Sequence, residues 1–278
     1  MEQVKLYKTL INEPTFKRNY AAKQAHGKYL AFFDDDIEVF PCCVDKMAGY
    51  LDKHQDVGMV YALLYRMGTK EYDTTGCFLS WTGFLYETYT KPKHPIPVMA
   101  SKSACCMIRR DLFFKLGGFD KDFVIYGEET DLSWRVWLAG YKVMMLPQAK
   151  AFHAFETQFK PRSYYNNYYI HYHGSKNYVT MLIKNLGWSR MWIANINWNI
   201  WLVMGIAMWF KNRKASKWIL QGCWYNVTHL GYILSKRRRT QELRKVKDRQ
   251  LFSQFFKNPP VRYYFQRFFE YLTHQLHG

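Results

Sequence analysis

The chain has 278 residues, of which 49% are hydrophobic, so it can form a sizeable core and is not a disordered polymer. Its net charge of +18 is uneven: residues 1–156 carry 20 Lys and Arg against 19 Asp and Glu, whereas residues 157–278 carry 20 against 3. The six cysteines form no C-x-x-C pair, which argues against a zinc site or a disulfide framework and favours a reducing compartment.

Helical and strand patterns alternate along the first part of the chain, which indicates an α/β sandwich. The expected helices cover residues 18–25, 41–54, 111–116 and 128–139. The expected buried strands cover residues 29–33, 57–61, 98–108 and 141–146, and Pro147 is expected to end the last of them. Residues 66–97 are rich in Gly and Pro and are predicted to form loops.

Three consecutive aspartates, Asp34, Asp35 and Asp36, follow the apolar run Tyr29–Phe33. Three like charges at the end of a buried strand are costly without a counter-ion. A divalent cation held by carboxylate oxygens, with a phosphate on its far side, would supply one. Asp34 and Asp36 would then share the metal, and Asp35 would reach a ribose or sugar hydroxyl. The alternative is a solvated turn that caps the following helix.

A second acidic cluster, Glu128, Glu129 and Asp131, lies in the first turn of a predicted helix. The helix dipole keeps such carboxylates ionised, and one of them could take a proton from an acceptor hydroxyl. The alternative is ordinary helix N-terminal acidity, with Glu128 or Asp131 paired to Arg135. His153 follows the last predicted strand and could complete an oxygen-rich metal site, although a lone histidine is more often structural.

The second part of the chain is basic and rich in aromatic residues. The run 191–210 has no formal charge and is long enough to span a membrane, but it contains Asn195, Asn197 and Asn199. On a helix Asn195 and Asn199 share a face and Asn197 points the other way, so no orientation hides all three. Together with the amphipathic run 218–234 and its basic end, this pattern favours helices lying on an anionic membrane surface over spanning ones.

Two stretches resemble family-2 glycosyltransferases of the GT-A fold. The string from Asn19 to Asp36 resembles their D-x-D region, and Gly127 to Arg135 resembles their E-D-x-D-L-x-x-R helix. The run from Ala139 to His153 is similar to the end of their catalytic domain, in the rhamnosyl- and galactofuranosyltransferase-like branch. The resemblance covers about residues 12–156 and implies a GT-A-like catalytic domain over 1–156. A basic helical, membrane-associating region would follow over 157–278, with the boundary near 155–161.

The resemblance implies a role for each matched residue. Asp34 and Asp36 would hold Mg2+ or Mn2+ against the diphosphate of a nucleotide sugar, and His153 would complete the coordination. Glu129 would be the catalytic base, at a position where the family more often has Asp. Glu128 and Asp131 would orient the acceptor or the base.

The resemblance also implies a hexosyltransferase that moves a sugar, with inversion, from a nucleotide-sugar donor to a saccharide or lipid-linked acceptor. It would act in cell-surface polysaccharide or glycolipid assembly at the cytoplasmic face of the membrane. Members of the family begin with strands that precede the D-x-D region, so the fold is expected to be N-terminally incomplete. A non-catalytic membrane-surface binding protein derived from such a domain is the alternative. A nucleic-acid-binding role ranks lowest, because no nucleic-acid motif accompanies the basic residues.

Overall fold

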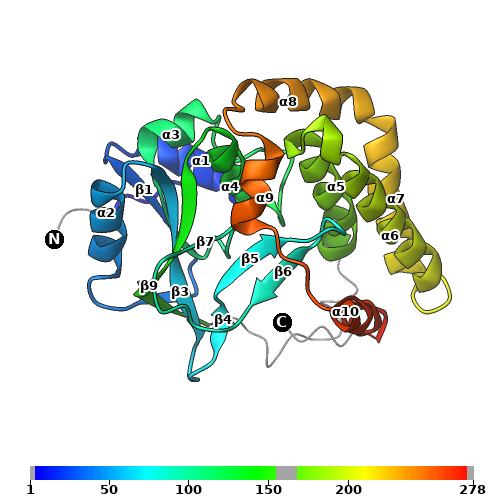
Figure 1. The fold of residues 1–278 in the computed structure, drawn as a ribbon, viewed down its shortest axis with the longest axis horizontal. Coiled ribbons are helices and arrows are strands. Elements are labelled where there is room, and N and C mark those ends of the chain that lie inside the picture. Colours follow the sequence, from blue (N-terminus) through cyan, green and yellow to red (C-terminus); the bar gives the residue numbers. More distant parts are fainter. Residues whose placement is uncertain (1–3, 155–167, 274–278) are drawn as a thin grey trace.

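The computed structural model describes residues 4–154 and 168–273. A mixed α/β part comes first, and a group of helices follows it and packs beside it (Figure 1).

The central sheet has the strand order β1-β8-β3-β9-β2, and β3 and β9 form its parallel pair. These strands are β1 (Tyr29–Phe33), β8 (Cys105–Arg109), β3 (Val57–Arg66), β9 (Lys142–His153) and β2 (Ile37–Val39). Two short strands extend this sheet, β4 (Tyr72–Thr74) beside β3 and β7 (Ile96–Pro97) beside β9. A separate hairpin consists of β5 (Gly76–Leu79) and β6 (Leu85–Thr88).

Helices cover both faces of this sheet, as an α/β sandwich requires. Alternate residues of β3 point to opposite faces. Val60 and Leu64 belong to the apolar cluster that contains α2 (Cys43–Lys53), whereas Met59 and Tyr61 belong to the cluster that contains α4 (Glu128–Leu138). Two further helices, α1 (Pro14–Gln24) and α3 (Arg110–Lys115), contribute Ala22, Leu112 and Phe113 to the second cluster.

The helices that follow residue 167 share the core of the sheet. They are a π-helical turn (Tyr169–His173), α5 (Gly174–Asn185), a 3-10 turn (Trp188–Arg190), α6 (Trp192–Met208), α7 (Arg213–Thr228), α8 (Leu230–Glu242), α9 (Asp248–Phe255) and α10 (Val261–Thr273). Leu182 of α5 and Phe255 of α9 lie in one buried cluster with Trp134 and Trp137 of α4. The expected boundary at 155–161 falls outside the described residues, so the two-domain division stays a prediction.

Three expectations about the elements are wrong. Strand β9 continues through Pro147 to His153, because its register against β3 shifts between Leu146 and Lys150 and the proline sits in this irregularity, where no ladder hydrogen bond is needed. The segment predicted as loops contains β4 to β7. The strand expected over 98–108 is confined to β8, which begins only at Cys105.

Candidate functional site

The chain reversal between β1 and β2 brings the aspartate turn to the end of β9. In the antiparallel pairing of β2 with β9, Ile37 lies opposite His153. The backbone N–H of Ala154 donates a 2.9 Å hydrogen bond to the carbonyl oxygen of Asp36. This pairing places Oδ2 of Asp36 3.4 Å from Nε2 of His153.

The structure brings the three predicted metal ligands together. One ligand atom each from Asp34, Asp36 and His153 lies within 4.8 Å of the other two. His153 is buried, whereas both aspartates are partly open to solvent. Two carboxylates and one imidazole suit Mn2+ and, with more water ligands, Mg2+. The donor set therefore fits a divalent cation with room for an outside ligand.

Asp73 and Lys102 orient the histidine of this centre. Nδ1 of His153 lies 2.8 Å from Oδ2 of Asp73, and Nζ of Lys102 lies 2.6 Å from the other oxygen. Burial alone would raise the pKa of the Asp73 carboxyl, but the His153 hydrogen bond and the Lys102 charge outweigh it and lower that pKa. An ionised Asp73 accepts a hydrogen bond from Nδ1–H of His153 and leaves Nε2 available to a metal.

Arg18 of α1 links the aspartate turn to α4. Its guanidinium lies 2.5 Å from Oδ1 of Asp34 and 3.2 Å from Oε1 of Glu128. The same side chain lies over the ring of Phe119, 5.6 Å from its centroid. Arg18 therefore holds the two acidic clusters beside each other and compensates part of their negative charge.

Glu128 and Glu129 begin α4 directly after Gly127, whose φ of 86° permits the turn into the helix. Glu128 is buried, and its Oε2 has no hydrogen-bond partner among the described residues. Burial raises the pKa of Glu129 well above its usual range, and the charge of Glu128 raises it further. Glu129 is therefore a stronger proton acceptor than a solvated carboxylate.

Asp131 and Asp35 lie in very different surroundings. Asp131 is fully buried, and its oxygens accept hydrogen bonds from Arg135, Lys184 and Asn185, each at 2.9 Å. A carboxylate with no exposed surface and filled oxygens joins α4 to α5, and the expected role of Asp131 in orienting an acceptor or base stays a prediction. Asp35 is exposed at the turn, where a ligand hydroxyl could reach it.

Sequence reasoning missed the residues that position these groups. Arg18 was read only as the start of a helix, and Lys102 lay inside an expected strand. Asp73 lies in the segment that was predicted to be loops, 80 residues from His153 in sequence. No local sequence pattern predicts the contact between Asp73 and His153, because that contact depends on the pairing of β4 with β3.

A cavity of about 700 Å³ is lined in part by Arg66 of β3. In the register of β3 against β9, Arg66 lies opposite His153. Tyr86 and Tyr263 meet edge to face with ring centroids 5.1 Å apart, and the hydroxyl of Tyr89 donates to Glu87 at 2.7 Å. The lining residues are Arg66, Lys70, Glu71, Tyr72, Tyr86, Glu87, Tyr89, Tyr263, Gln266 and Arg267.

Comparison with known proteins gives consistent similarities. Residues 29–234 match the model of the family described as glycosyl transferase family group 2. The O-antigen biosynthesis protein RfbC of Myxococcus xanthus is 30% identical over 148 residues, which are 49% of this chain and 12% of that protein. The N-acetylglucosaminyl-diphospho-decaprenol L-rhamnosyltransferase of Mycobacterium tuberculosis is 28% identical over 122 residues, 43% of this chain and 37% of that protein. The chain thus spans well under half the length of these two relatives.

A solved structure shows the fold. Residues 1–349 of S. aureus TarS align with a TM-score of 0.50 and 13% identity, over 83% of this chain and 69% of that one. The GT-A-like α/β fold predicted for the chain is confirmed by this likeness.

Proposed function

The chain belongs to glycosyl transferase family group 2, and from this premise we propose that it is a metal-dependent, inverting glycosyltransferase. It moves a sugar from a nucleotide-sugar donor to a saccharide or lipid-linked acceptor in the assembly of a cell-surface polysaccharide or glycolipid. The observation that carries the proposal is the meeting of Asp34, Asp36 and His153 at the end of β9, beside a helix that begins with Glu128 and Glu129.

Asp34, Asp36 and His153 would hold Mg2+ or Mn2+. The cation would neutralise charge on the diphosphate that leaves the donor sugar. The buried Asp73 keeps the histidine in the orientation that this role needs, and Arg18 limits repulsion between Asp34 and Glu128. The exposed Asp35 is placed to accept a hydrogen bond from a hydroxyl of the donor.

Glu129 acts as the base in this proposal. It accepts the proton of the acceptor hydroxyl while that oxygen bonds to the anomeric carbon, and the bond to the diphosphate breaks on the opposite face. The proton transfer suits Glu129 because burial and the neighbouring Glu128 raise its pKa above the usual carboxyl range, which makes the ionised side chain a stronger proton acceptor. The product carries the inverted anomeric configuration, since only one displacement takes place.

The tyrosine-lined cavity is our proposed acceptor face. Tyrosine rings present flat apolar surfaces with a polar edge, which suits sugar rings whose two faces differ in the same way. Glu87 and Arg267 add hydrogen-bonding groups to the lining. Because Arg66 adjoins His153, an acceptor in this cavity would end near the metal-binding residues.

Helices α6 to α8 form our proposed membrane-facing surface, at the cytoplasmic face. Exposed on them and on the turn between α6 and α7 are Val203, Ile206, Trp209, Phe210, Trp224, Val227, Leu230, Tyr232 and Leu234. By length and composition, the described residues contain one helix able to cross a membrane, Trp188–Met208. Asn197 on it is fully buried and donates to the carbonyl of Thr82, so one side of α6 is occupied by protein. We therefore favour a peripheral position on anionic lipid.

Donor turnover tests the proposal. The purified chain is incubated with a panel of nucleotide sugars with Mn2+ or with EDTA, and release of nucleoside diphosphate is followed, while Mn2+ binding is measured separately by electron paramagnetic resonance. We expect turnover only with the metal, and loss of both turnover and Mn2+ binding in Asp36→Ala. Undiminished turnover in Asp36→Ala, or in EDTA, would overturn it.

The exposed apolar and basic residues of α6 to α8 also favour a second candidate, a membrane-surface binding protein without activity. A chain that binds anionic liposomes at low salt but consumes no donor in any of these assays would support it.

A further inference from the structure

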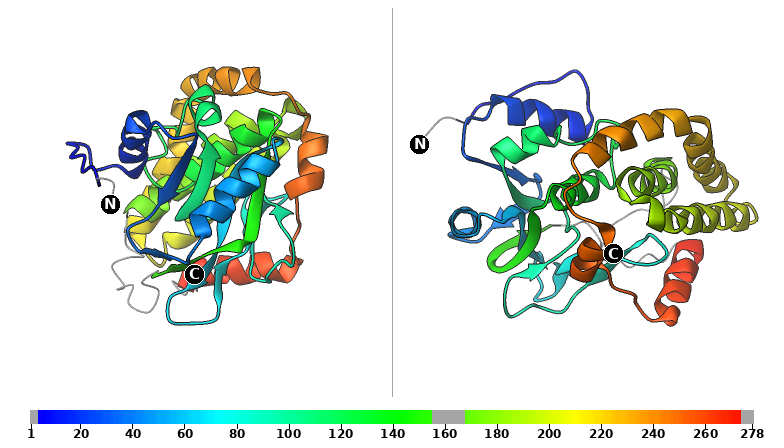
Figure 2. Two further views of the ribbon diagram at one scale, coloured as in Figure 1. Left: turned by 90° about the vertical axis from the view of Figure 1, so that its left-hand side faces the viewer. Right: turned by 45° about the horizontal axis from the view of Figure 1, so that its top comes forward.

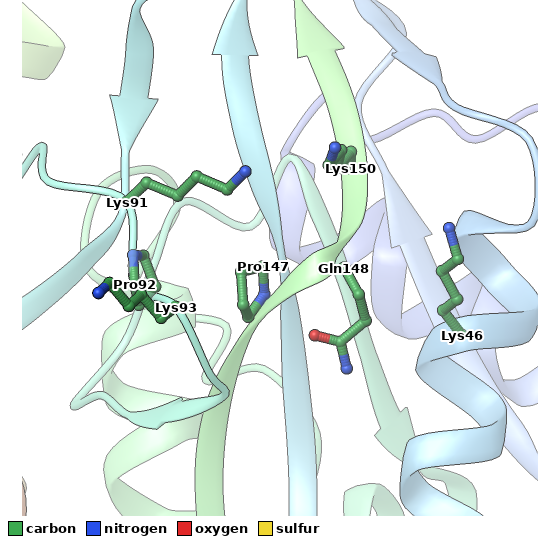
Figure 3. Close-up of a pocket in the computed structure, with 7 residues that line it drawn as sticks. All are labelled: Lys46, Lys91, Pro92, Lys93, Pro147, Gln148 and Lys150. Atoms are coloured by element: carbon green, nitrogen blue, oxygen red, sulfur yellow. The ribbon is translucent and has the colours of Figure 1, made fainter.

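A second cavity lies at the edge of β9, and none of the predicted metal ligands lines it. It has a volume of about 550 Å³ and contains Lys46 from α2, Lys150 from β9, and Lys91 and Lys93 from the loop between β6 and β7. Pro92, Pro147 and Gln148 complete the lining (Figure 3). We call this cavity the lysine notch.

The irregularity of β9 creates the notch. Strand β7 pairs with β9 at Met144 and Met145, and β2 pairs with it from Ala151 to His153. Between these two pairings the described strands leave the edge of β9 open, and Pro147 there has no N–H to offer another strand. The notch is therefore built into the sheet edge and lined by three separate elements.

The charge of the notch is uncompensated. Its lining includes four lysines and no carboxylate, although residues 1–156 as a whole carry nearly equal numbers of basic and acidic residues. Within the residues that the structure describes, none of these four lysines forms a salt bridge. In Figure 3 the Lys91 side chain extends toward the sheet, in which Lys150 lies on β9, whereas the Lys93 ammonium points away from it. Gathered cations of this kind repel one another and attract a multiply charged anion.

We propose that the lysine notch binds the diphosphate group of a soluble ligand. Lysine ammoniums are compact point charges that suit phosphate oxygens, and the four of them carry at least as much positive charge as two linked phosphates carry negative charge. The volume accommodates such a group with part of the molecule attached to it. No metal is needed, because the cations are the protein's own. The site is independent of the glycosyl-transfer proposal.

The position of the notch argues for a soluble source of this group. Figure 1 shows α2 at one end of the long axis and α6 and α7 at the other, and the right panel of Figure 2 agrees. A bilayer that met α6 and α7 would lie on the side of the molecule opposite Lys46. A lipid headgroup is therefore poorly placed to fill the notch while the helices rest on the same membrane.

Titration calorimetry with inorganic pyrophosphate tests the proposal on the full chain, at low ionic strength and with EDTA. The anion should bind without a metal, and Lys46→Ala with Lys150→Ala should weaken binding about ten-fold. The matched control is Lys53→Ala with Lys115→Ala, which removes two exposed lysines from α2 and α3 and should leave binding unchanged. Equal loss in both variants, or no binding in EDTA, would overturn the proposal.

Gln148→Glu provides a second test, because it changes the charge of one side chain without making that side chain smaller. The new carboxylate enters the lysine notch, so pyrophosphate binding should disappear while the melting temperature at low salt rises, because repulsion among the lysines is relieved. Unchanged pyrophosphate binding would overturn the proposal. A final arm uses phosphatidylglycerol vesicles: equal vesicle binding by wild type and the Lys46/Lys150 variant supports a soluble source, and selective loss in the variant overturns it.

Discussion

The aspartate turn and Asp131 of the second acidic cluster look alike in sequence but differ in how far their oxygens are already occupied. At the turn 34–36, Asp35 is exposed and Asp34 and Asp36 are partly open. In the first turn of α4, Asp131 is fully buried with its oxygens taken by Arg135, Lys184 and Asn185. A carboxylate whose hydrogen-bonding capacity is filled by the protein holds the fold together, whereas one with capacity to spare is available to a metal, substrate or proton.

Glu129 is a carboxylate available to a substrate or proton, and its replacement should have the largest effect on activity. Glu129→Gln removes the proton acceptor without changing the size of the side chain, so sugar transfer should fall by about 10²- to 10⁴-fold. Mn2+ binding should be unchanged, because Glu129 does not belong to the metal-binding group. Steady-state transfer rates and Mn2+ titration measure the two effects.

Glu129→Asp sharpens the same test. The shorter carboxylate keeps the chemistry and changes only the reach, so part of the activity should return relative to Glu129→Gln. Equal activity in Glu129→Gln and wild type would show that another group takes the proton.

The oxygens of Asp131 are fully occupied by protein donors, so its replacement should lower the stability of the fold. Asp131→Asn leaves Lys184 with a weakened partner in a buried site and should lower the free energy of unfolding by about 3 kcal/mol. Denaturant melts measure this loss. Asp111→Asn, on an exposed carboxylate of α3, is the control and should change little.

The pH dependence of this effect follows from the Asp131 pKa. Burial alone would raise that pKa, but Lys184 and Arg135 outweigh it and lower it below the ordinary carboxyl value. The stabilisation is therefore complete above the unfolded pKa of about 3.9 and is lost as the pH falls through the folded value. The difference between Asp131→Asn and wild type should be constant from about pH 5 upward and shrink in acid. A difference that grew on acidification would contradict this assignment.

Asp73 is intermediate: both of its oxygens are occupied by protein groups, but one of those groups, His153, is available to a metal. Asp73→Asn removes the charge that fixes the His153 ring, so Mn2+ affinity should fall by about 10- to 100-fold with the fold intact. Mn2+ titration by electron paramagnetic resonance measures the affinity, and circular dichroism checks the fold. The neighbouring Glu71→Gln changes an exposed carboxylate paired with Arg66 and serves as the control. Equal affinities in the two variants would refute the positioning role.

The contrast between Asp36 and Asp73 explains how far sequence reasoning reached. The aspartate turn follows a short apolar strand, and β1 was predicted with its observed bounds, Tyr29–Phe33. Local pattern therefore sufficed for the turn, and the family resemblance favoured a metal-binding role for His153 over a structural one. Asp73, Lys102 and the continuation of β9 past Pro147 depend on which strands pair at a distance and where a register shifts, and no local periodicity encodes either.

The amides of α6 extend the comparison to uncharged groups and give the smallest expected effect. Asn197 is fully buried and donates a hydrogen bond of 2.9 Å to the carbonyl oxygen of Thr82. Asn199 is exposed and donates a hydrogen bond to the carbonyl oxygen of Asn195 on its own helix. Asn197→Ala leaves a buried carbonyl without its donor and should cost about 1–2 kcal/mol of unfolding free energy. Asn199→Ala, the matched control, should lower the free energy of unfolding by a few tenths of a kcal/mol at most, because water can replace the hydrogen bond that the exposed side chain made. Equal costs in denaturant melts would mean that α6 is not held against the β5–β6 hairpin by this contact, and a spanning position for the helix would regain support.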